Sequence, residues 1–443
     1  MSECNGNASV IVLDSFEAIA AAAESPTTFH KATTITLRDC HIDTAAAAKV
    51  VDLLFEKKSN LKELIVNKCT GHQLGTILTV ALTACTVLES LSIFVTGSRS
   101  GTFDPIAHAL GVGLLTNKSI KKVELGIGSY SNFFSLTSDA ARSLEQGLSG
   151  NTSLYVLHVS NCRFEEREAL RIFCKGLQSM SSLRNAGFAS CYEANGQPLE
   201  DQNVACLVRA LEQCSDLESL DLRKNKCLDV GMIALASLLD RTPIKKINLL
   251  AQQMDRNEFM NTFHLVGALG RTSTLESLLL SSNNLSTDYD MANLAAALTH
   301  NTSVKILDLS DNDIRSSAMN ILSSRIPSMR VLETLYVDGN YRLDNEASRN
   351  LANAMNENSI IRRITCDEHL ADYESIRYYA DLNWGGRRFI EQQNNASDDD
   401  IPSILLSLWP EVLSRICRLS HDCERRANAI YFCLQKGSVV FPV

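Results

Sequence analysis

A repeated pattern of apolar residues constrains the fold of this chain more than any other feature of its sequence. Leucine or valine stands at the first, fourth and sixth positions of each copy, and asparagine stands at the ninth. The four strong copies cover residues 217–225, 275–283, 304–312 and 332–340. Patterns that return about every 30 residues are typical of repeat proteins, in which similar units stack on one another. We therefore expect one long repeat domain.

Weaker copies extend the pattern in both directions and bring the total to twelve units. They end at Cys40, Cys69, Thr96, Gly128, Cys162, Cys191, Gln252 and His369. Each unit begins with a short strand motif and continues with helical spacing, as in residues 233–239 and 294–298. Because a helical connection returns the next strand parallel to the first, the units predict a curved parallel sheet with helices on its convex side.

The residue that closes each strand motif has a predicted structural role. An asparagine or cysteine there can pair with backbone groups that the turn leaves without partners. We therefore expect Cys40, Cys69, Cys162 and Cys191 to be buried thiols. The fourteen cysteines are dispersed and form no C-x-x-C pair, which favours reduced thiols.

Residues 417–423 contain zinc-type side chains, but their spacing is unlike that of a zinc site, so we predict no metal and no cofactor.

A second set of asparagines stands three residues before a strand motif, where a helix is expected to end. Its members are Asn117, Asn151, Asn301 and Asn358. Asparagine tolerates the left-handed backbone conformation found at many helix ends, so we expect these residues to terminate helices in that conformation. The first three also lie in N-x-S/T sequons, and we interpret them as helix stops rather than glycan sites.

The strand motif, followed by a helix and then by Asn-Thr-Ser and an apolar residue, resembles leucine-rich repeat proteins of the ribonuclease-inhibitor-like class. The resemblance covers about residues 30–370. It implies an α/β leucine-rich repeat solenoid of about twelve repeats with helical caps. It is specific for the fold but not for the function, because the class includes enzyme inhibitors, Ran GTPase-activating proteins, sensor domains of innate-immune receptors and scaffolds.

The segments outside the repeats are expected to cap them. Residues 1–30 form a predicted N-terminal cap with a helix at 16–23, residues 31–370 the repeat domain, and residues 371–443 a C-terminal helical cap or tail. Such caps protect the edge strand and the apolar core of a terminal repeat. The segment that begins at Trp409 is weakly similar to the start of an F-box, but a cap helix explains the same residues.

Composition and missing motifs exclude several functions. Lysine and arginine number 42 against 51 aspartates and glutamates, a net charge of −9, which argues against nucleic-acid binding. No apolar run reaches the roughly 20 residues of a membrane span, and the amino terminus lacks a secretion signal. We therefore expect a soluble cytoplasmic protein, with the nucleus as the alternative.

The usual linear catalytic signatures, such as a P-loop or G-x-S-x-G, are missing from the sequence, so we predict no enzymatic activity. The alternative is a GTPase activator resembling the Ran-activating proteins. Those proteins usually end in a long acidic run, whereas this chain has only residues 398–400.

The concave face is the first predicted binding surface. Side chains alternate along a strand, so the residue between the two inward leucines points away from the core. These positions are Thr36, Ile65, Ser92, Glu124, His158, Gly187, Asp221, Asn248, Leu279, Asp308, Tyr336 and Thr365; two neighbouring columns add Arg38, Phe94, Lys122, Arg223, Asp338, Arg363 and Asp367. From these columns we predict that a protein partner contacts Phe94, Glu124, His158, Asp221, Asp308, Tyr336 and Asp338.

The loops after the strands form a second predicted surface. The long units carry their extra residues at 97–103, 129–136, 192–201 and 253–259, and insertions at one position of a solenoid gather on one edge. Tyr130, Phe133, Phe134 and Tyr192 make this edge aromatic, which suits protein recognition, although packing over the core is the alternative. We add Phe133 and Phe134 to the predicted partner-binding residues. The sequence thus favours a non-enzymatic protein-interaction module or scaffold.

Overall fold

The computed structural model describes residues 10–24, 32–58, 60–71, 73–95, 103–127, 133–252 and 263–391. The chain divides into two compact units, Met1–Asp255 and Arg256–Val443. Within each unit, short parallel strands alternate with helices along the chain. The predicted cap residues after 391 lie outside the described residues, as do Tyr130 and Trp409.

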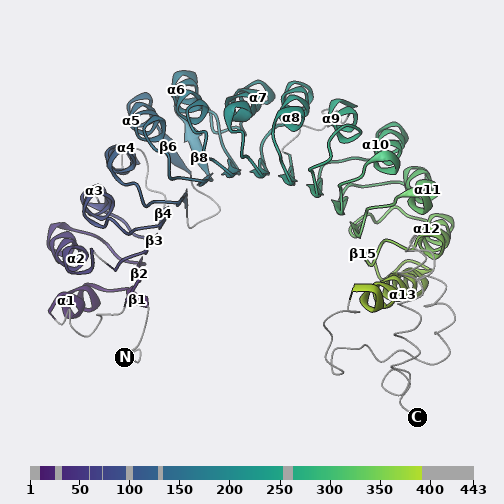
Figure 1. The fold of residues 1–443 in the computed structure, drawn as a ribbon, viewed down its shortest axis with the longest axis horizontal. Coiled ribbons are helices and arrows are strands. Elements are labelled where there is room, and N and C mark those ends of the chain that lie inside the picture. Colours follow the sequence, from purple (N-terminus) through teal and green to yellow (C-terminus); the bar gives the residue numbers. More distant parts are fainter. Residues whose placement is uncertain are drawn as a thin grey trace, which may run out of the picture. The chain divides into compact units, whose positions relative to one another are not determined.

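The first unit contains a parallel sheet whose strands follow one another in sequence order. These strands are β1 (Val10–Leu13), β2 (Thr34–Arg38), β3 (Glu63–Asn67), β4 (Ser90–Val95), β5 (Lys122–Ile127), β7 (Val156–Val159), β9 (Asn185–Gly187), β10 (Ser219–Asp221) and β11 (Lys246–Asn248). Its helices are α1 (Phe16–Glu24), α2 (Thr44–Lys57), α3 (Leu74–Ala84), α4 (Phe103–Thr116), α5 (Ser138–Ser149), α6 (Arg167–Gln178), α7 (Asp201–Ala210) and α8 (Asp229–Arg241). A second, two-stranded parallel sheet pairs β6 (Phe134–Leu136) with β8 (Cys162–Phe164). The long sheet lines the concave side of this unit and the helices line the convex side (Figure 1).

The second unit repeats the same arrangement. Its strands are β12 (Ser277–Leu279), β13 (Ile306–Asp308), β14 (Thr334–Tyr336) and β15 (Arg363–Thr365), and they pair in parallel in this order. Its helices are α9 (Phe263–Leu269), α10 (Asp288–His300), α11 (Ser316–Arg325), α12 (Asn345–Glu357) and α13 (Tyr373–Glu391). Each of the twelve predicted strand motifs therefore contains a strand, which confirms the α/β repeat solenoid.

One strand was not expected. β1 lies within the predicted N-terminal cap and pairs in parallel with β2, Ile11 opposite Ile35 and Leu13 opposite Leu37. Its Val-Ile-Val-Leu sequence suits a strand because β-branched side chains pack well on a pleated surface. Ile11 and Leu13 are buried, whereas Val10 and Val12 are exposed. The helix predicted at 16–23 is present as α1.

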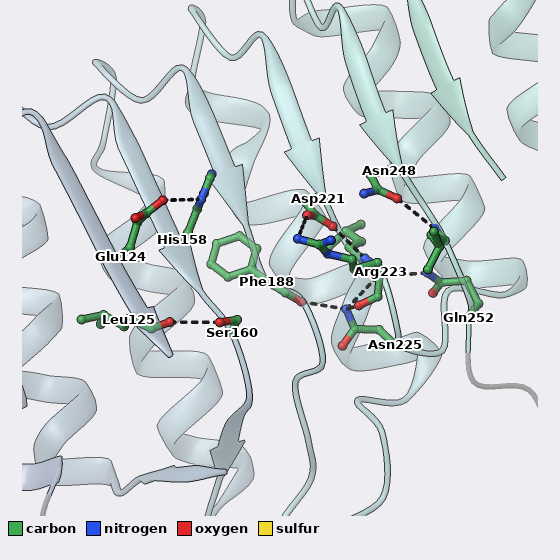
Figure 2. Close-up of polar contacts among 12 residues, drawn as sticks. Glu124, Leu125, His158, Ser160, Phe188, Asp221, Arg223, Asn225, Asn248 and Gln252 are labelled. Atoms are coloured by element: carbon green, nitrogen blue, oxygen red, sulfur yellow. Dashed lines mark hydrogen bonds and ion pairs between the residues drawn. The ribbon is translucent and has the colours of Figure 1, made fainter. Parts of the chain in front are cut away.

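The residues that close the strand motifs form the predicted bonds to the backbone. Asn225 is fully buried, and its Nδ2 donates to the carbonyl oxygens of Phe188 and Leu222, each at 2.8 Å (Figure 2). Its Oδ1 accepts from the Cys191 N–H at 3.0 Å. Asn312 and Asn340 bond to their neighbouring units in the same way. The side chain of one unit thus pairs with backbone groups of the unit before it.

The cysteines at the same position are buried and free, as predicted. Cys40, Cys69, Cys162 and Cys191 form no disulfide. The sulfurs of Cys40 and Cys69 share a hydrogen bond at 3.3 Å, and the Cys191 thiol lies 3.8 Å from the Val159 carbonyl oxygen. Their structural role is therefore that of small buried side chains with weak polar contacts.

The left-handed backbone conformation occurs at the strand exit rather than at the helix exit. The residue immediately before the closing position has a positive φ in most units: Asp39, Lys68, Asn161, Ser190, Lys224, Ala251, Ser282, Asp311 and Gly339. Asn301 and Asn358, by contrast, have φ of −69° and −85° and extended backbones. The prediction of left-handed asparagines at the helix ends was wrong.

The helix-exit asparagines act through their side chains instead. In Asn301, Nδ2 donates to the Leu269 carbonyl at 2.7 Å, and Oδ1 accepts from the Val304 N–H at 2.7 Å. Asn117, Asn151 and Asn358 make equivalent bonds to the helix of the preceding repeat. All four are buried. Since their amides are committed to buried carbonyl groups, the interpretation of the sequons as structural elements holds.

We expect Asn312→Ala to destabilise the second unit. The change removes partners from the carbonyl oxygens of Leu280 and Ser310 and from the N–H groups of Asn283 and Leu285. Unsatisfied buried groups cost about 1–3 kcal/mol each, so a loss of at least about 2 kcal/mol in unfolding free energy is expected. Asn350→Ala is the control, because Asn350 makes a single side-chain bond to Asn320 on the helices. Equal melting temperatures for the two variants would contradict this role.

Candidate functional site

The strand register brings four predicted partner-binding residues to one part of the concave face. Glu124 on β5 is paired with His158 on β7, His158 with Gly187 on β9, and Gly187 with Asp221 on β10. Phe94 stands on β4. The predicted columns are thus aligned across adjacent strands, about 4.8 Å apart.

These residues line a shallow hollow of about 220 Å³. Its walls include Phe94, Glu124, His158, Ser160, Asp221 and Arg223. Figure 2 shows Glu124 and His158 pointing toward each other from neighbouring strands, with Asp221 and Arg223 further along the sheet. We call this feature the concave hollow. It is formed entirely within the first unit.

Small residues form the floor of the concave hollow. A methyl group on Gly187 would lie 2.9 Å from Cδ2 of His158, and one on Gly126 would lie 3.1 Å from Cδ1 of Phe94. The contact at Gly187 is too close, so a glycine there lets the His158 ring lie over the neighbouring strand; at Gly126 a methyl group would also lie 2.6 Å from Ser160 Oγ, so that hydroxyl and the Phe94 ring would have to shift. Ala189 extends this floor. The strand alternation predicts Gly187 in the concave column but not the role of these small residues. A run of small residues in aligned columns is the signal that could have revealed it.

Glu124 is the electrostatic centre of the hollow. Its carboxylate accepts from Ser92 Oγ at 2.9 Å and lies 3.0 Å from Lys122 Nζ and 3.4 Å from His158 Nδ1. The hydrogen bond from His158, followed by those from Lys122 and Ser92, lowers the pKa of Glu124 to about 2, although burial opposes the shift. Glu124 therefore stays ionised and holds the His158 ring in place.

An ion pair lies at the other end of the hollow. Arg223 Nη2 lies 3.0 Å from Asp221 Oδ2, and the Arg223 N–H donates to Asp221 Oδ1 at 3.1 Å. The Arg223 side chain is half exposed. Asp221 holds the backbone N–H and one guanidinium nitrogen of Arg223, but half of the arginine side chain remains exposed. Arg223 can therefore contact a side chain of a bound partner.

The second unit holds the other concave residues that the sequence indicated. Asp308 is paired with Tyr336 across β13 and β14, and the guanidinium group of Arg363 lies 5.6 Å from the Tyr336 ring centroid. Asp338 accepts a hydrogen bond from Thr365. Burial, with further contributions from Asp338, Asp308 and Asp367, raises the pKa of Asp311. These carboxylates form an acidic surface.

The loop edge divides into a buried and an accessible part. The sequence placed Phe134 there as a partner-binding residue, but its side chain is only 5% exposed and stacks on Phe103 with ring centroids 4.2 Å apart. Phe134 points inward because side chains alternate along β6, so it belongs to the core. Phe133 is partly exposed and packs against Arg163 and Tyr192, at 4.2 and 5.7 Å from its ring centroid.

Two further observations apply to the part of the chain that the structure describes. No group of three or more histidine, cysteine, aspartate or glutamate residues there could hold a metal ion. No helix there has both the length and the apolar character that a membrane span requires.

The repeated strand-and-helix units define an α/β leucine-rich repeat solenoid. No protein-family model matches the sequence. Leucine-rich repeat-containing protein 73 of Rattus norvegicus and that of Homo sapiens are each 26% identical to this chain over 268 residues, 59% of this chain and 81% of theirs. Among solved structures, an internalin from Listeria monocytogenes matches with a TM-score of 0.42 and 15% identity, covering 79% of this chain and 78% of the internalin. The repeat, the solenoid and the curated relatives identify the chain as a leucine-rich repeat protein.

We expect His158→Ala to raise the pKa of Glu124 from about 2 toward its ordinary value of 4.5, because the hydrogen bond from His158 is the largest cause of the shift. The folded-state pKa is depressed, so this carboxylate stabilises the fold above pH 4.5, and the contribution is lost as pH falls toward 2. A carbon-detected NMR titration of labelled glutamate measures the midpoint. His41→Ala is the control, since His41 bonds to Thr70 elsewhere. An unchanged midpoint in His158→Ala would contradict the assignment.

Proposed function

We propose that this protein is a non-enzymatic protein-interaction module or scaffold of the ribonuclease-inhibitor-like class. A protein partner binds the concave face and the post-strand loop edge. The observation that carries this proposal is the concave hollow, in which an aromatic ring, a histidine and an arginine converge on an open surface.

The size of the hollow favours a protein partner over a small molecule. Small-molecule pockets usually enclose about 300–1,000 Å³, whereas this hollow measures about 220 Å³. It suits one or two side chains of a larger surface. The strands from β4 to β10 span about 20 Å at 4.8 Å per strand, so a partner seated there also reaches the flanking columns.

The chemistry of the hollow also favours protein recognition. Energetic hot spots in interfaces are enriched in aromatic residues and arginine, and Phe94 and Arg223 lie at its two ends. Glu124 and Asp221 are already paired with cations, so a partner meets no unbalanced charge. In the second unit, Asp308, Tyr336 and Asp338 offer an acidic surface that suits a basic segment. Phe133, with Arg163 and Tyr192, provides the accessible part of the loop edge.

We propose a reducing compartment, the cytoplasm or the nucleus, as the place of action. The ten cysteines in the described part of the chain are all free, and several are buried close to another thiol. Reduced cysteines at this density are typical of intracellular proteins.

Phe94→Ala combined with His158→Ala is expected to abolish partner capture without unfolding the protein. Affinity purification with mass spectrometry compares the parent chain, this double variant and Arg142→Ala, a control on the exposed face of α5. Proteins retained by the parent and the control but lost by the double variant support the proposal. With a purified partner, the double variant should lose at least about 2 kcal/mol, or thirtyfold in affinity. Equal retention by all three proteins would contradict a role for the concave hollow.

Two further variants locate the rest of the interface. Tyr336→Ala with Asp308→Ala tests the second unit, and Phe133→Ala tests the loop edge. Binding titrations beside thermal melts separate lost contacts from lost stability. Unchanged affinity in the first variant together with a loss in the second would move the main contact to the loops.

We also expect that the protein does not accelerate GTP hydrolysis by a Ran-like GTPase. Phosphate release from the GTPase is measured with and without the purified chain. A stimulation of tenfold or more would replace the binding-module proposal with the GTPase-activator alternative.

A further inference from the structure

A second cavity, unrelated to the concave hollow, lies between α6 and α7 on the convex face. It measures about 750 Å³ and is open to solvent along the two helices. We call it the convex groove. Its volume lies within the range of small-molecule sites.

The convex groove carries excess positive charge. Arg167 and Arg171 on α6 and Arg209 on α7 all line it, against one acidic residue, Glu168. Glu168 Oε2 lies 4.0 Å from Arg171 Nη1, at the outer limit of an ion pair. Arg167 and Arg209 make no ion pair within the described residues. Arginine guanidinium groups bind carboxylates in a bidentate geometry, so the groove suits an anion with carboxylate groups.

A pair of cysteines lies in the wall of this groove. Cys206 on α7 is partly exposed and lines the cavity, while Cys174 on α6 is buried beside it. The two thiols are neighbours that interact, and each is the largest cause of the shift in the other's pKa. The thiol that lines the groove therefore has a second, buried thiol as a neighbour.

The surroundings favour the thiolate form of Cys206. The neighbouring Cys174 side chain, with smaller contributions from Arg171 and Arg209, lowers the pKa of Cys206 to about 6 against the opposing effect of burial. The Cys206 side chain and burial in turn raise the pKa of Cys174. Cys85 and Cys214 show the usual behaviour of structural cysteines, since burial raises the pKa of each thiol. The thiolate is the nucleophile in thiol–disulfide exchange.

We propose that Cys206 undergoes thiol–disulfide exchange with small disulfides that carry carboxylate groups, such as glutathione disulfide, which the arginines hold in the convex groove. The Cys206 thiolate attacks one sulfur of the reagent, a Cys206–reagent disulfide forms, and the reagent's own sulfur–sulfur bond breaks. The departing thiolate takes a proton from water. Cys174 then loses its proton to solvent and attacks Cys206, which releases the second reagent thiolate and leaves a Cys174–Cys206 disulfide. Two protein thiols are oxidised and one reagent disulfide is reduced to two thiols.

The first experiment compares an anionic reagent with a neutral one. The full-length reduced chain is incubated with glutathione disulfide or with hydroxyethyl disulfide, and peptide mass mapping follows every cysteine. Cys206 is expected to react about tenfold faster with the anionic reagent, a preference of roughly 1.4 kcal/mol. Arg167→Gln, Arg171→Gln and Arg209→Gln combined should reduce the ratio of the two rates to about one. Arg142→Gln on α5 is the control and should keep the preference.

Loss of the arginines also lowers the fraction of Cys206 that is present as thiolate, but this change slows the reactions with both reagents equally. The ratio of the two rates therefore reports anion binding alone. Equal rates for both reagents in the parent chain would overturn the recognition of carboxylates. Faster modification of another described cysteine than of Cys206 would overturn the site.

The second experiment tests the partner thiol. In the parent chain, the mixed disulfide at Cys206 should be transient and should give way to a Cys174–Cys206 disulfide. Cys174→Ser should stop at the mixed disulfide, and Cys206→Ser should form neither product. Circular dichroism and thermal melts establish that both variants are folded. A mixed disulfide that is as stable in the parent as in Cys174→Ser would refute the second step.

Discussion

Hydrogen bonds from single buried side chains to backbone groups of the adjacent repeat are the interactions on which the rest of this structure depends. Each strand is short, and the chain turns sharply after it, so buried N–H and C=O groups remain that the sheet cannot pair. Asn225, Asn312 and Asn340 supply these partners at the strand exits, and Asn117 and Asn301 supply them at the helix exits. Because each asparagine serves a neighbouring repeat as well as its own, adjacent repeats stabilise one another.

This dependence explains why cysteine can replace asparagine at some positions. The Cys191 side chain makes only a weak contact with the Val159 carbonyl, but the Cys191 N–H is satisfied by Asn225 from the next repeat. Two residues after the closing Asn225, the Cys227 N–H also donates to a side chain of the next repeat, to Gln252 Oε1 at 2.9 Å. A small apolar thiol suffices where the following repeat provides the polar group. Stability is therefore shared between nearest neighbours, as expected of a solenoid.

The periodic parts of this structure could be predicted from the sequence, and the non-periodic parts could not. The predicted columns of concave residues were correct, as the pairing of Glu124 with His158 shows. Side chains alternate along each strand, and the parallel register aligns equivalent positions of adjacent strands, so the members of each column are fixed. Strand β1 was missed because Phe16 stands at its closing position, where the twelve recognised units have a small or polar residue. Phe134 was misplaced because β6 pairs with β8, which lies 28 residues further along the chain, and no repeat pattern indicates this contact. The helix-exit asparagines were assigned the wrong conformation because a local backbone preference was outweighed by bonds to the preceding repeat.

The residues of the concave hollow could be predicted from the sequence, whereas those of the convex groove could not, because the two sites occupy different parts of the repeat. The concave hollow is built from residues at equivalent positions of successive repeats, so sequence columns reveal its members even though the role of Gly126 appears only in three dimensions. The convex groove is built from the outer faces of α6 and α7, where packing of the core does not fix the residue type. Its proposed chemistry arises from Cys206, the neighbouring Cys174 and the arginines around them. Both sites involve the same stretch of the chain, since α6 follows β7 and α7 follows β9. The sheet and the helices present them on opposite sides (Figure 1), so a partner on the strands leaves Cys206 accessible to small molecules. Recognition on one face and thiol chemistry on the other are therefore compatible in a single repeat scaffold.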